Sequence, residues 1–527
     1  MSAAAFAQPP APLPSFAELE AAGAKVGQIR ISAQDVFDLT DPKEDKALFR
    51  LANKLHVQTR PSVIERALLF QTGDPVSVRL IEENERLLRG NRYLYDVQFR
   101  VAAVHEGVAD IDVVTRDTWS LELGGSIGRQ GGANTSGVQI RDHNLLGTGV
   151  SASLGRSKTV DRSGTEVRLT DPRAFGGWTA VDISHASNSD GKRDAFSVAH
   201  PFYALDSRWA AGASAVSDDR VDAIYNAGSI TGRYRHTLKQ GELFGGWSEG
   251  LVGGWVNRLS FGLSVQDDAY AVEPGLAPPA SLPAEQRLRG PFARWELIED
   301  RYEREFNRNL IGKPEFFALG WASTVQLGWA STRMGSLANA LLYSASASGG
   351  TTPAPGQLLV LAAKVSGQVI DGTGRHEALG VQAQYYLPQS PRWLFYASAA
   401  ADAVRHADAA EALQLGGDNG LRGYPLRYQS GTRRALFSAE ERFYTDLYIW
   451  QLFRIGGAAF FDIGRAWGGE GTNTVNPGWL KNVGAGLRIV STRSAFSNVL
   501  HIDIAMPLDA TSDIKKVQLL VKTRATF

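Results

Sequence analysis

Cysteine is absent from the chain of 527 residues, which excludes disulfide bonds and thiolate metal sites and agrees with a periplasmic or outer-membrane location. Uninterrupted apolar runs of about 18 residues are absent too, so no helix is expected to cross a membrane. Neither sign of charge is in excess, because 55 lysine and arginine residues balance 55 aspartate and glutamate residues. Net charge therefore gives no reason to expect a nucleic acid or an acidic substrate. If the chain spans a membrane, it must do so as a closed β-barrel.

Motifs for a nucleotide phosphate, a cofactor or a metal are also missing. The nine histidines show no metal-ligand spacing, and there is no His-Glu-x-x-His. Residues 124–128 match the Gly-x-Ser-x-Gly of serine hydrolases, with Ser126 in the nucleophile position, but that motif needs a strand-turn-helix elbow. Here Leu121, Leu123 and Ile127 share one face, as in a strand. We therefore expect no catalytic residue, no cofactor and no metal.

Glycine and aromatic residues, by contrast, are plentiful. The chain has 55 Gly, 12 Trp, 15 Tyr and 23 Phe, which suits twisted strands and the aromatic girdles of membrane barrels. From Trp119 onward, apolar and polar residues alternate in segments of about 10 residues separated by Gly, Asp, Asn and Ser turns. A soluble β-sandwich would show the same alternation. The last residue, Phe527, favours a barrel because a C-terminal Phe on an alternating strand resembles the insertion signal of outer-membrane barrels.

The region 118–527 is therefore predicted to form a transmembrane β-barrel. At about 25 residues per strand and connection, it holds about 16 antiparallel strands. The first strand is expected at about 119–129 and the last at about 515–527, and these two must pair to close the barrel. Polar stretches at 266–290 and 345–357 are expected to be extracellular loops.

Two smaller regions precede the barrel. Residues 1–24 are expected to be a signal-peptide remnant and a proline-containing linker, since Ala5-Phe6-Ala7 fits a small-x-small cleavage site. No basic n-region or complete apolar h-region precedes that site, so either the true start lies further upstream or the segment is a flexible terminus. Residues 25–117 are expected to form a small α+β domain that begins with a strand at 26–37.

The helices of this domain follow from caps and apolar spacing. Asp41-Pro42-Lys43-Glu44 is typical of a helix start, and Leu48, Leu51 and Leu55 supply the apolar stripe of that helix. Further helices are expected at 61–70 and 78–89. Two alternating strands, joined by a hairpin at Glu106-Gly107, end the domain.

Two short motifs near the C-terminus carry the specific chemistry. Gly416-Gly417-Asp418-Asn419-Gly420-Leu421-Arg422-Gly423-Tyr424-Pro425 surrounds one arginine and one tyrosine with four glycines and a proline, which predicts a folded-back loop. In Phe460-Phe461-Asp462-Ile463-Gly464-Arg465-Ala466-Trp467, one acid lies among apolar neighbours on a strand. A loop arginine and a strand aspartate, both flanked by apolar residues, indicate a partly buried, charge-assisted pair.

These motifs resemble those of a known family. Leu421-Arg422-Gly423-Tyr424 resembles the Arg-Gly-Tyr/Phe signature on the sixth extracellular loop of the outer-membrane assembly and two-partner-secretion transporter superfamily, the bacterial surface antigen type of Gram-negative cells. Phe460, Asp462 and Gly464 resemble its companion Phe-x-Asp-x-Gly strand motif. Residues 25–117 resemble a polypeptide-transport-associated (POTRA) domain with an extra helix after its first strand. Residues 144–149 resemble the family's Asn-x-x-Gly-x-Gly turn.

The resemblance implies a sixteen-stranded outer-membrane barrel whose lumenal loop places Arg422 against Asp462, with Glu440 as a second acceptor. It implies a non-enzymatic protein that inserts, assembles or secretes client polypeptides, with a periplasmic POTRA-like domain and a lateral gate between the first and last strands. The expected partners are an unfolded client polypeptide, the lipid bilayer, and periplasmic chaperones or the general outer-membrane assembly machinery, without nucleic acid. Two alternatives stay open: a passive pore or structural barrel, and an outer-membrane enzyme that uses Ser126.

Overall fold

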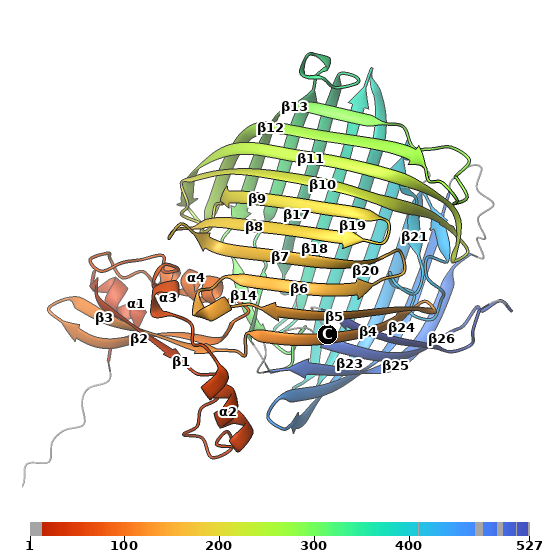
Figure 1. Cartoon of the computed structure of the whole chain (residues 1–527). Coiled ribbons are helices and arrows are strands. Elements are labelled where there is room, and N and C mark those ends of the chain that lie inside the picture. The colour runs from red at the N-terminus through yellow and green to blue at the C-terminus, as the bar shows by residue number, and fades with distance from the viewer. Residues whose placement is uncertain are drawn as a thin grey trace, which may run out of the picture. The chain divides into compact units, whose positions relative to one another are not determined.

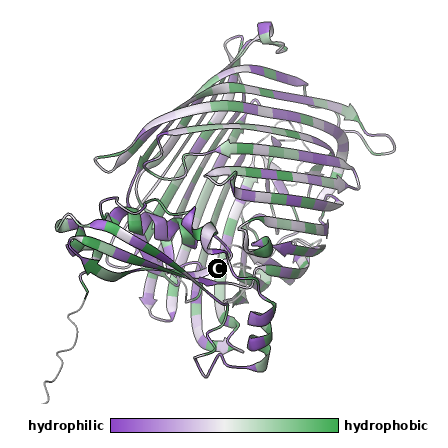
Figure 2. Cartoon of the chain, turned by 60° about the vertical axis from the view of Figure 1, so that its left-hand side comes forward, coloured by the Kyte–Doolittle hydropathy of each residue, from purple (hydrophilic) through white to green (hydrophobic). Residues whose placement is uncertain are grey.

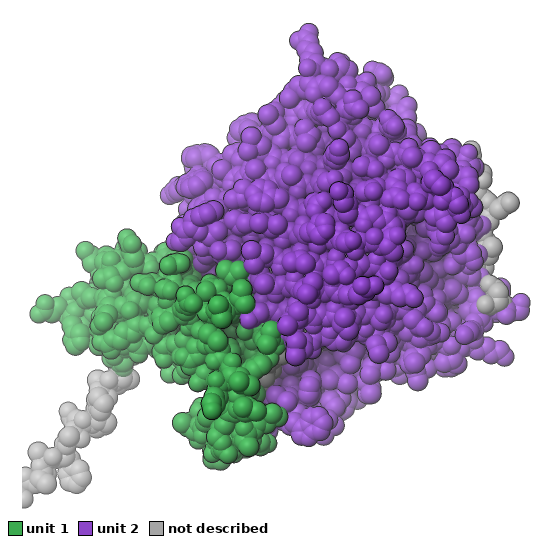
Figure 3. Space-filling view, viewed as in Figure 1, with its two compact units in different colours: residues 1–121, 143–150, 493–495 green, residues 122–142, 151–492, 496–527 purple. Residues whose placement is uncertain are grey.

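A computed structural model describes residues 13–312, 314–408, 411–468, 478–492, 499–512 and 514–524. The predicted insertion signal at Phe527 lies outside these described residues. The chain forms two compact units, which Figure 3 shows in different colours. Unit 1 comprises residues 1–121, 143–150 and 493–495, and unit 2 comprises residues 122–142, 151–492 and 496–527.

Within its described residues, unit 1 contains a three-stranded sheet and four α-helices (Figure 1). Strand β3 (Val108–Asp117) lies in the middle of the sheet, parallel to β1 (Lys25–Gln34) and antiparallel to β2 (Leu94–His105). The helices are α1 (Phe16–Ala21), α2 (Ala47–Leu55), α3 (Pro61–Glu65) and α4 (Val78–Arg89). Every second residue of β3 is buried, as the alternation in the sequence predicts. The predicted turn between β2 and β3 is present, with Glu106 and Gly107 both at positive φ.

Several local predictions for unit 1 need correction. The region 1–24 is not only a linker, because it contains α1, whose N-cap Ser15 forms a capping box with Glu18. The helix predicted at 61–70 already ends at Glu65 as α3. The helix predicted at 78–89 is confirmed as α4.

Helix α2 differs most from the prediction. It begins at Ala47 rather than near Asp41, because the Glu44 carboxylate accepts hydrogen bonds from the Asp38 amide at 2.8 Å and from Arg116 Nη2 at 2.7 Å. These bonds hold residues 41–44 in a turn instead of a first helical turn.

Residues 143–150 connect two strands of unit 2 but belong to unit 1. They include the short 3₁₀ helix η1 (Leu145–Gly147). Asn144 Nδ2 donates to Thr59 Oγ1 at 2.8 Å, and its Oδ1 accepts from the Gly149 amide at 2.7 Å. A side chain at Gly147 would meet the carbonyl oxygen of Gln58, so the glycine of this turn permits a close backbone approach.

Unit 2 is a closed antiparallel barrel of twenty strands in the described residues. Hydrophobic and hydrophilic residues alternate along many of its strands (Figure 2). No helix in the described part of the chain combines the length and apolar character that crossing a membrane requires. The barrel strands are β4 (Leu121–Gln130), β5 (Ala133–Asp142), β6 (Ser151–Lys158), β7 (Ser163–Ala174), β8 (Thr179–Asn188), β9 (Gly191–His200), β10 (Trp209–Asn226), β11 (Ser229–Val252), β12 (Trp255–Val272), β13 (Gln286–Glu299), β16 (Ala322–Ala330), β17 (Ala340–Thr351), β18 (Leu358–Ile370), β19 (Thr373–Ser390), β20 (Trp393–Arg405), β23 (Arg433–Ile449), β24 (Phe453–Trp467), β25 (Leu480–Ser491), β26 (Val499–Pro507) and β27 (Gln518–Arg524).

The expected count of about 16 strands is therefore wrong. Many connections are tight turns of two residues, such as 131–132, 227–228 and 371–372, so each strand and connection uses fewer residues than the assumed ~25. The predicted loops at 266–290 and 345–357 are confirmed only in part, because 273–285 and 352–357 connect elements while the remaining half of each stretch belongs to strands.

Strand alternation gives the barrel two distinguishable ends. We define the loop end by the connections 131–132, 159–162, 227–228 and 406–432, and the hairpin end by the connections 300–321, 352–357, 391–392 and 450–452. The connection 406–432 contains the small sheet of β21 (Leu413–Leu415) and β22 (Gln429–Gly431), and 300–321 contains β14 (Tyr302–Phe306) and β15 (Pro314–Ala318). The 3₁₀ helix η2 (Thr332–Met334) follows β16.

The barrel closes where its first strand, β4, meets its last, β27. Most neighbouring strands pair over seven or more residues, as β26 and β27 do. Between β27 and β4, by contrast, the described residues provide one register pair, Val521 with Arg129. The closing seam is therefore short in the described part of the barrel.

Candidate functional site

The loop 406–432 folds back into the barrel and buries its own apolar residues. Its backbone turns at Gly416, whose carbonyl accepts from the Leu421 amide at 3.0 Å. The loop residues in the resulting cluster pack against residues of β24 and β25, and the cluster contains Leu415, Leu421, Tyr424, Tyr428, Ala466, Leu480 and Ile514. Apolar packing therefore brings the loop against the wall and presents Arg422 to it.

Arg422 lies against two carboxylates of the barrel's inner face. Its Nε and Nη2 donate to Asp462 at 2.8 and 2.6 Å, and its Nη1 donates to Glu440 at 2.7 Å. The Phe460 ring lies under the guanidinium, with its centroid 3.4 Å from Cζ. Burial lowers the pKa of Arg422, but the charges of Asp462 and Glu440 outweigh burial and raise it. The arginine therefore stays charged, and this bidentate geometry is one that lysine does not reproduce.

The residues next to Arg422 and Asp462 in the two motifs also hold the loop against the barrel wall. A side chain on Gly423 would lie 2.6 Å from Asn482 Cβ, so only glycine lets the loop approach β25 this closely. The Gly423 amide donates to Asn482 Oδ1 at 3.1 Å, and Asn482 Nδ2 donates to Asp462 at 2.8 Å. Tyr424 is fully buried, and its hydroxyl donates to the Lys481 carbonyl at 3.0 Å. Gly464 leaves room for Leu415, whose Cδ2 would lie 3.0 Å from an added Cβ.

The charged contact continues along β23 toward the hairpin end. Glu440 also accepts from Arg442 Nε at 2.9 Å. Arg442 Nη1 in turn donates to the backbone carbonyl of Arg308, in the connection 300–321, at 2.8 Å. We call Asp462, Arg422, Glu440 and Arg442 the buried charge row, since each is at most 3% exposed.

The connection 300–321 is the second segment that folds against the inner face. We call residues 302–318 the lumenal hairpin. Its turn is held by Glu315, whose carboxylate accepts from the amides of Arg308, Asn309 and Leu310. Its Ile311 and the following Leu319 enter an apolar cluster formed with wall residues Leu358, Tyr386, Leu394, Tyr444, Ala458, Val490 and Val499. The hairpin therefore packs against strands from β18 to β26.

A second arginine ties the loop to the other side of the barrel. Arg427 Nη1 and Nη2 donate to the two oxygens of Asp161, in the β6–β7 connection, at 2.9 and 2.8 Å. Its guanidinium carbon also lies 4.3 Å from the ring centroid of Tyr225 at the end of β10. The adjacent Leu426 amide donates to the Gly131 carbonyl at 2.9 Å. The loop thus connects β23 and β24 with turns on the far wall at the loop end.

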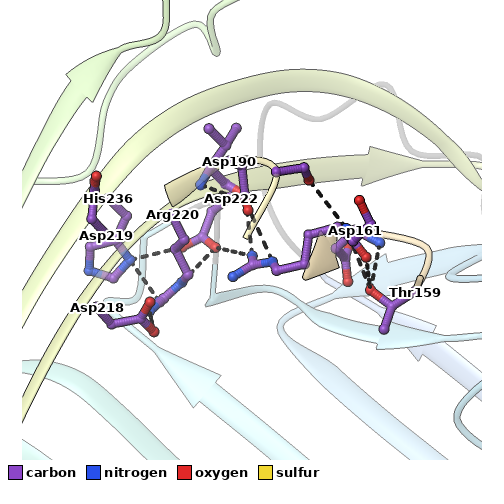
Figure 4. A network of polar contacts seen from close by, with 12 residues as sticks. Thr159, Asp161, Asp190, Asp218, Asp219, Arg220, Asp222 and His236 are labelled. Carbon is purple, nitrogen blue, oxygen red and sulfur yellow. Dashed lines mark hydrogen bonds and ion pairs between the residues drawn. The ribbon is translucent and has the colours of Figure 1, made fainter. Parts of the chain in front are cut away.

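The wall beside this anchor is lined by paired charges, which Figure 4 shows. Arg220 of β10 lies between Asp218, Asp222 and His236, with bonds of 2.8 to 2.9 Å. His236 also contacts Asp268 at 2.9 Å. This network lines a polar cavity of about 500 Å³ inside the barrel.

The structure brings together the residues that the motifs singled out, Leu421, Arg422, Gly423, Tyr424, Phe460, Asp462, Gly464 and Glu440. Sequence reasoning missed the hydrogen bonds of Arg442, the lumenal hairpin and the Arg427–Asp161 pair. No local sequence pattern predicts the Arg427–Asp161 pair, because its two residues are 266 positions apart. The group His376, Asp408 and Glu411 was also not visible in the sequence; in the described part of the chain its ligand atoms lie within 4.8 Å of one another. Ser126 lies inside strand β4, not at a strand-to-helix elbow.

The buried charge row predicts a strong effect of removing Arg422. Arg422→Ala leaves two buried carboxylates without their shared partner, which costs about 3–5 kcal/mol for a truly buried pair. The loop should then leave the wall while the barrel stays folded. Because the chain has no cysteine, maleimide labelling of a single Leu426→Cys reporter measures this release, and heat-modifiable gel migration reports the folded barrel.

Two comparisons make this prediction specific. Arg422→Lys should rescue only in part, Asp462→Ala should behave like Arg422→Ala, and the double variant should be milder than the sum of the singles. Arg433→Ala, at an exposed position of β23, is the matched control and should label as slowly as the parent. Additive effects, or fast labelling of Leu426→Cys in the parent, would contradict the anchoring of the loop by Arg422.

The Arg427–Asp161 pair predicts a weaker, pH-dependent effect. The pair is partly exposed, so Arg427→Ala should cost about 1 kcal/mol and speed labelling of Leu426→Cys about fivefold. Burial raises the pKa of the Asp161 carboxyl, but the hydrogen bonds and charge of Arg427 outweigh burial and hold it below its ordinary 3.8. The contribution is therefore complete above the ordinary pKa and is lost as the pH falls through the lowered one. Labelling rates that respond equally to acid in the parent and in Arg427→Ala would refute this origin.

Comparison with known proteins identifies the family. The sequence model of the Omp85 superfamily domain matches residues 144–520. No curated protein sequence matches the chain. Among solved structures, CdiB from Escherichia coli is similar with a TM-score of 0.50 and 15% identity, covering 95% of this chain and 76% of that one. BamA from Haemophilus ducreyi lacking POTRA domains 1–3 is similar with a TM-score of 0.41 and 12% identity, covering 94% and 84%.

The match to the family model supports, at the level of the family, a location in the outer membrane and a role in protein insertion or secretion there. The loop that carries Arg422 and the strand that carries Asp462 both lie within the matched residues. This chain belongs to the Omp85 superfamily.

Proposed function

We propose that this protein moves client polypeptides into or across the outer membrane without chemical catalysis. The buried charge row carries this proposal. It fixes the loop 406–432 inside the barrel through Arg422, and it also contacts the lumenal hairpin through Arg442. A polypeptide in the lumen would meet one of these segments from either end. Client passage therefore requires either their displacement or an exit through the wall.

The closing seam is the proposed exit. The pairing of β27 with β4 rests on one register pair in the described residues, so within those residues few hydrogen bonds hold the two strands together. Gly124, Gly125 and Gly128 weaken β4 further, because glycine offers no side chain for packing. We propose that the seam opens as a lateral gate.

Unit 1 is the proposed client-docking domain, POTRA-like and periplasmic. Its sheet has β3 in the middle, so β1 and β2 are edge strands. The unpaired backbone groups of an edge strand bind an extended peptide as an added strand, largely independent of side chains. An unfolded client, delivered by periplasmic chaperones or the general assembly machinery, fits this mode of recognition.

A deletion strain tests the proposed function. We expect specific outer-membrane or secreted proteins to disappear from its surface and medium proteomes and to return on complementation with the parent chain. Unchanged proteomes, together with ion conductance of the purified barrel in planar bilayers, would favour a passive pore. Hydrolysis of ester substrates that is lost in Ser126→Ala would favour an enzyme.

The lateral gate predicts that locking the seam stops client handling. A disulfide between Arg129→Cys and Val521→Cys, the register pair of the seam, should leave a folded barrel that fails to complement the deletion strain until a reductant is added. The matched control is a disulfide between Leu487→Cys and Ile502→Cys, a register pair of the neighbouring strands β25 and β26, which should complement fully. Full activity of the seam-locked protein would favour passage through the lumen instead.

A further inference from the structure

Helix α2 of unit 1 exposes the apolar stripe that the sequence places on it. A helical stripe of this kind normally faces a core, but Leu48, Leu51 and Leu55 are 64%, 50% and 63% exposed. Phe49 is the buried residue of the helix and stacks on Phe37 with ring centroids 4.0 Å apart. Figure 1 shows α2 as a separate arm of unit 1, apart from α1, α3 and α4.

The stripe points away from the domain. At about 100° per residue, Leu48, Leu51 and Leu55 fall within about 60° of one another on the helix. Phe49 and Asn53 lie on roughly the opposite side, and Asn53 fastens that side by exchanging hydrogen bonds with the Phe37 backbone at 3.1 and 2.8 Å. Unit 1 itself therefore leaves the leucine stripe uncovered.

Basic residues lie around α2 outside the stripe, with Lys54 beside it and Lys46 and Arg50 nearer the Phe49 side. Lys43, Lys46, Arg50 and Lys54 are all exposed around α2. Of the acids before the helix, Glu44 is buried against Arg116, Asp45 pairs with Arg50, and Asp38 and Asp41 accept from the Thr40 and Lys43 amides. Helix α2 itself contains no acid. An exposed leucine stripe on a helix whose charged residues are all basic is the pattern of a helix that lies in the surface of an anionic bilayer.

The end of α2 is fastened to the segment that leads into the barrel. His56 directly follows the helix, and its Nε2 lies 2.9 Å from Asp117 Oδ2. Asp117 is fully buried and also accepts from the amide and hydroxyl of Thr59 at 2.7 and 2.9 Å. Only residues 118–120 separate Asp117 from Leu121, where the first barrel strand begins. This short covalent link keeps α2 at a high effective concentration near any membrane that holds the barrel.

We propose that α2 is an interfacial helix that inserts Leu48, Leu51 and Leu55 into the surface of an anionic phospholipid leaflet, with its basic residues at the headgroups. A helix of nine residues is short for independent membrane binding, and the link through Asp117 compensates for this. The role would fix the orientation of unit 1 at the membrane. It needs only a barrel in a bilayer, so it does not depend on client transport.

Site-specific fluorescence on the full chain tests the proposal. The absence of cysteine permits a single environment-sensitive label at Leu51→Cys in nanodiscs of phosphatidylethanolamine and phosphatidylglycerol. We expect nitroxide-labelled lipids to quench this label several-fold more than a label at Glu82→Cys, an exposed site on α4, and aqueous iodide to show the reverse order. No client is present, so failure of the proposed transport function would not change the result.

Two further variants separate the contributions of apolar and charged residues. Leu55→Glu should reduce lipid quenching at position 51, whereas Gln58→Glu, at an exposed site just beyond the helix, should not. Changing Lys46, Arg50 and Lys54 together to glutamine should remove the preference for phosphatidylglycerol over phosphatidylcholine nanodiscs. Equal iodide quenching at 51 and 82 would overturn the proposal. Protection of position 51 from iodide without lipid quenching would also overturn it, because that result indicates a protein occupant.

Discussion

One arginine between two buried carboxylates sets the arrangement of the barrel interior. Arg422 neutralises Asp462 and Glu440 where water has little access, and none of the three could remain charged there alone at low cost. A buried ion pair adds little stability compared with apolar packing, but it accepts one geometry only. The motif residues around it follow from that demand: Gly423 permits the close approach, and Tyr424 ties the loop to β25 through the Lys481 carbonyl.

The size of the barrel gives a physical reason for the lumenal hairpin. The diameter of a barrel grows roughly linearly with strand number, so twenty strands enclose more space than the sixteen first expected. The hairpin fills part of that space with an apolar cluster that includes Ile311. Its backbone also receives a hydrogen bond from Arg442, so the two inward segments share one row of charges. A substitution of Glu440, which lies between Arg422 and Arg442, would therefore affect both the loop 406–432 and the lumenal hairpin.

Sequence reasoning succeeded where a short pattern determines the structure. The extent of α4, the Glu106-Gly107 turn and the barrel alternation are local features, and two motifs placed Arg422 opposite Asp462. It failed where distant residues decide. The strand number depends on the lengths of the turns. Strands rich in Ser, Ala and Gly, such as the end of β17 at 345–351, are polar enough to be taken for loops. The start of α2 depends on the hydrogen bond between Arg116 and Glu44, which keeps Glu44 out of the helix. The exposure of its leucines depends on Phe49, which packs the opposite side of the helix on Phe37.

The Arg427–Asp161 contact has a consequence for the order of folding. Contacts between residues 266 positions apart carry a large loop-closure cost and form late unless other structure first brings them together. Here β6 and β7 must already stand across from β23 before the guanidinium meets its carboxylate. The Arg427–Asp161 contact therefore forms only once the sheet has curved far enough to bring these strands together. In a barrel trapped as an open, partly rolled sheet, Arg422 would already bind Asp462 while Arg427 would still lack Asp161.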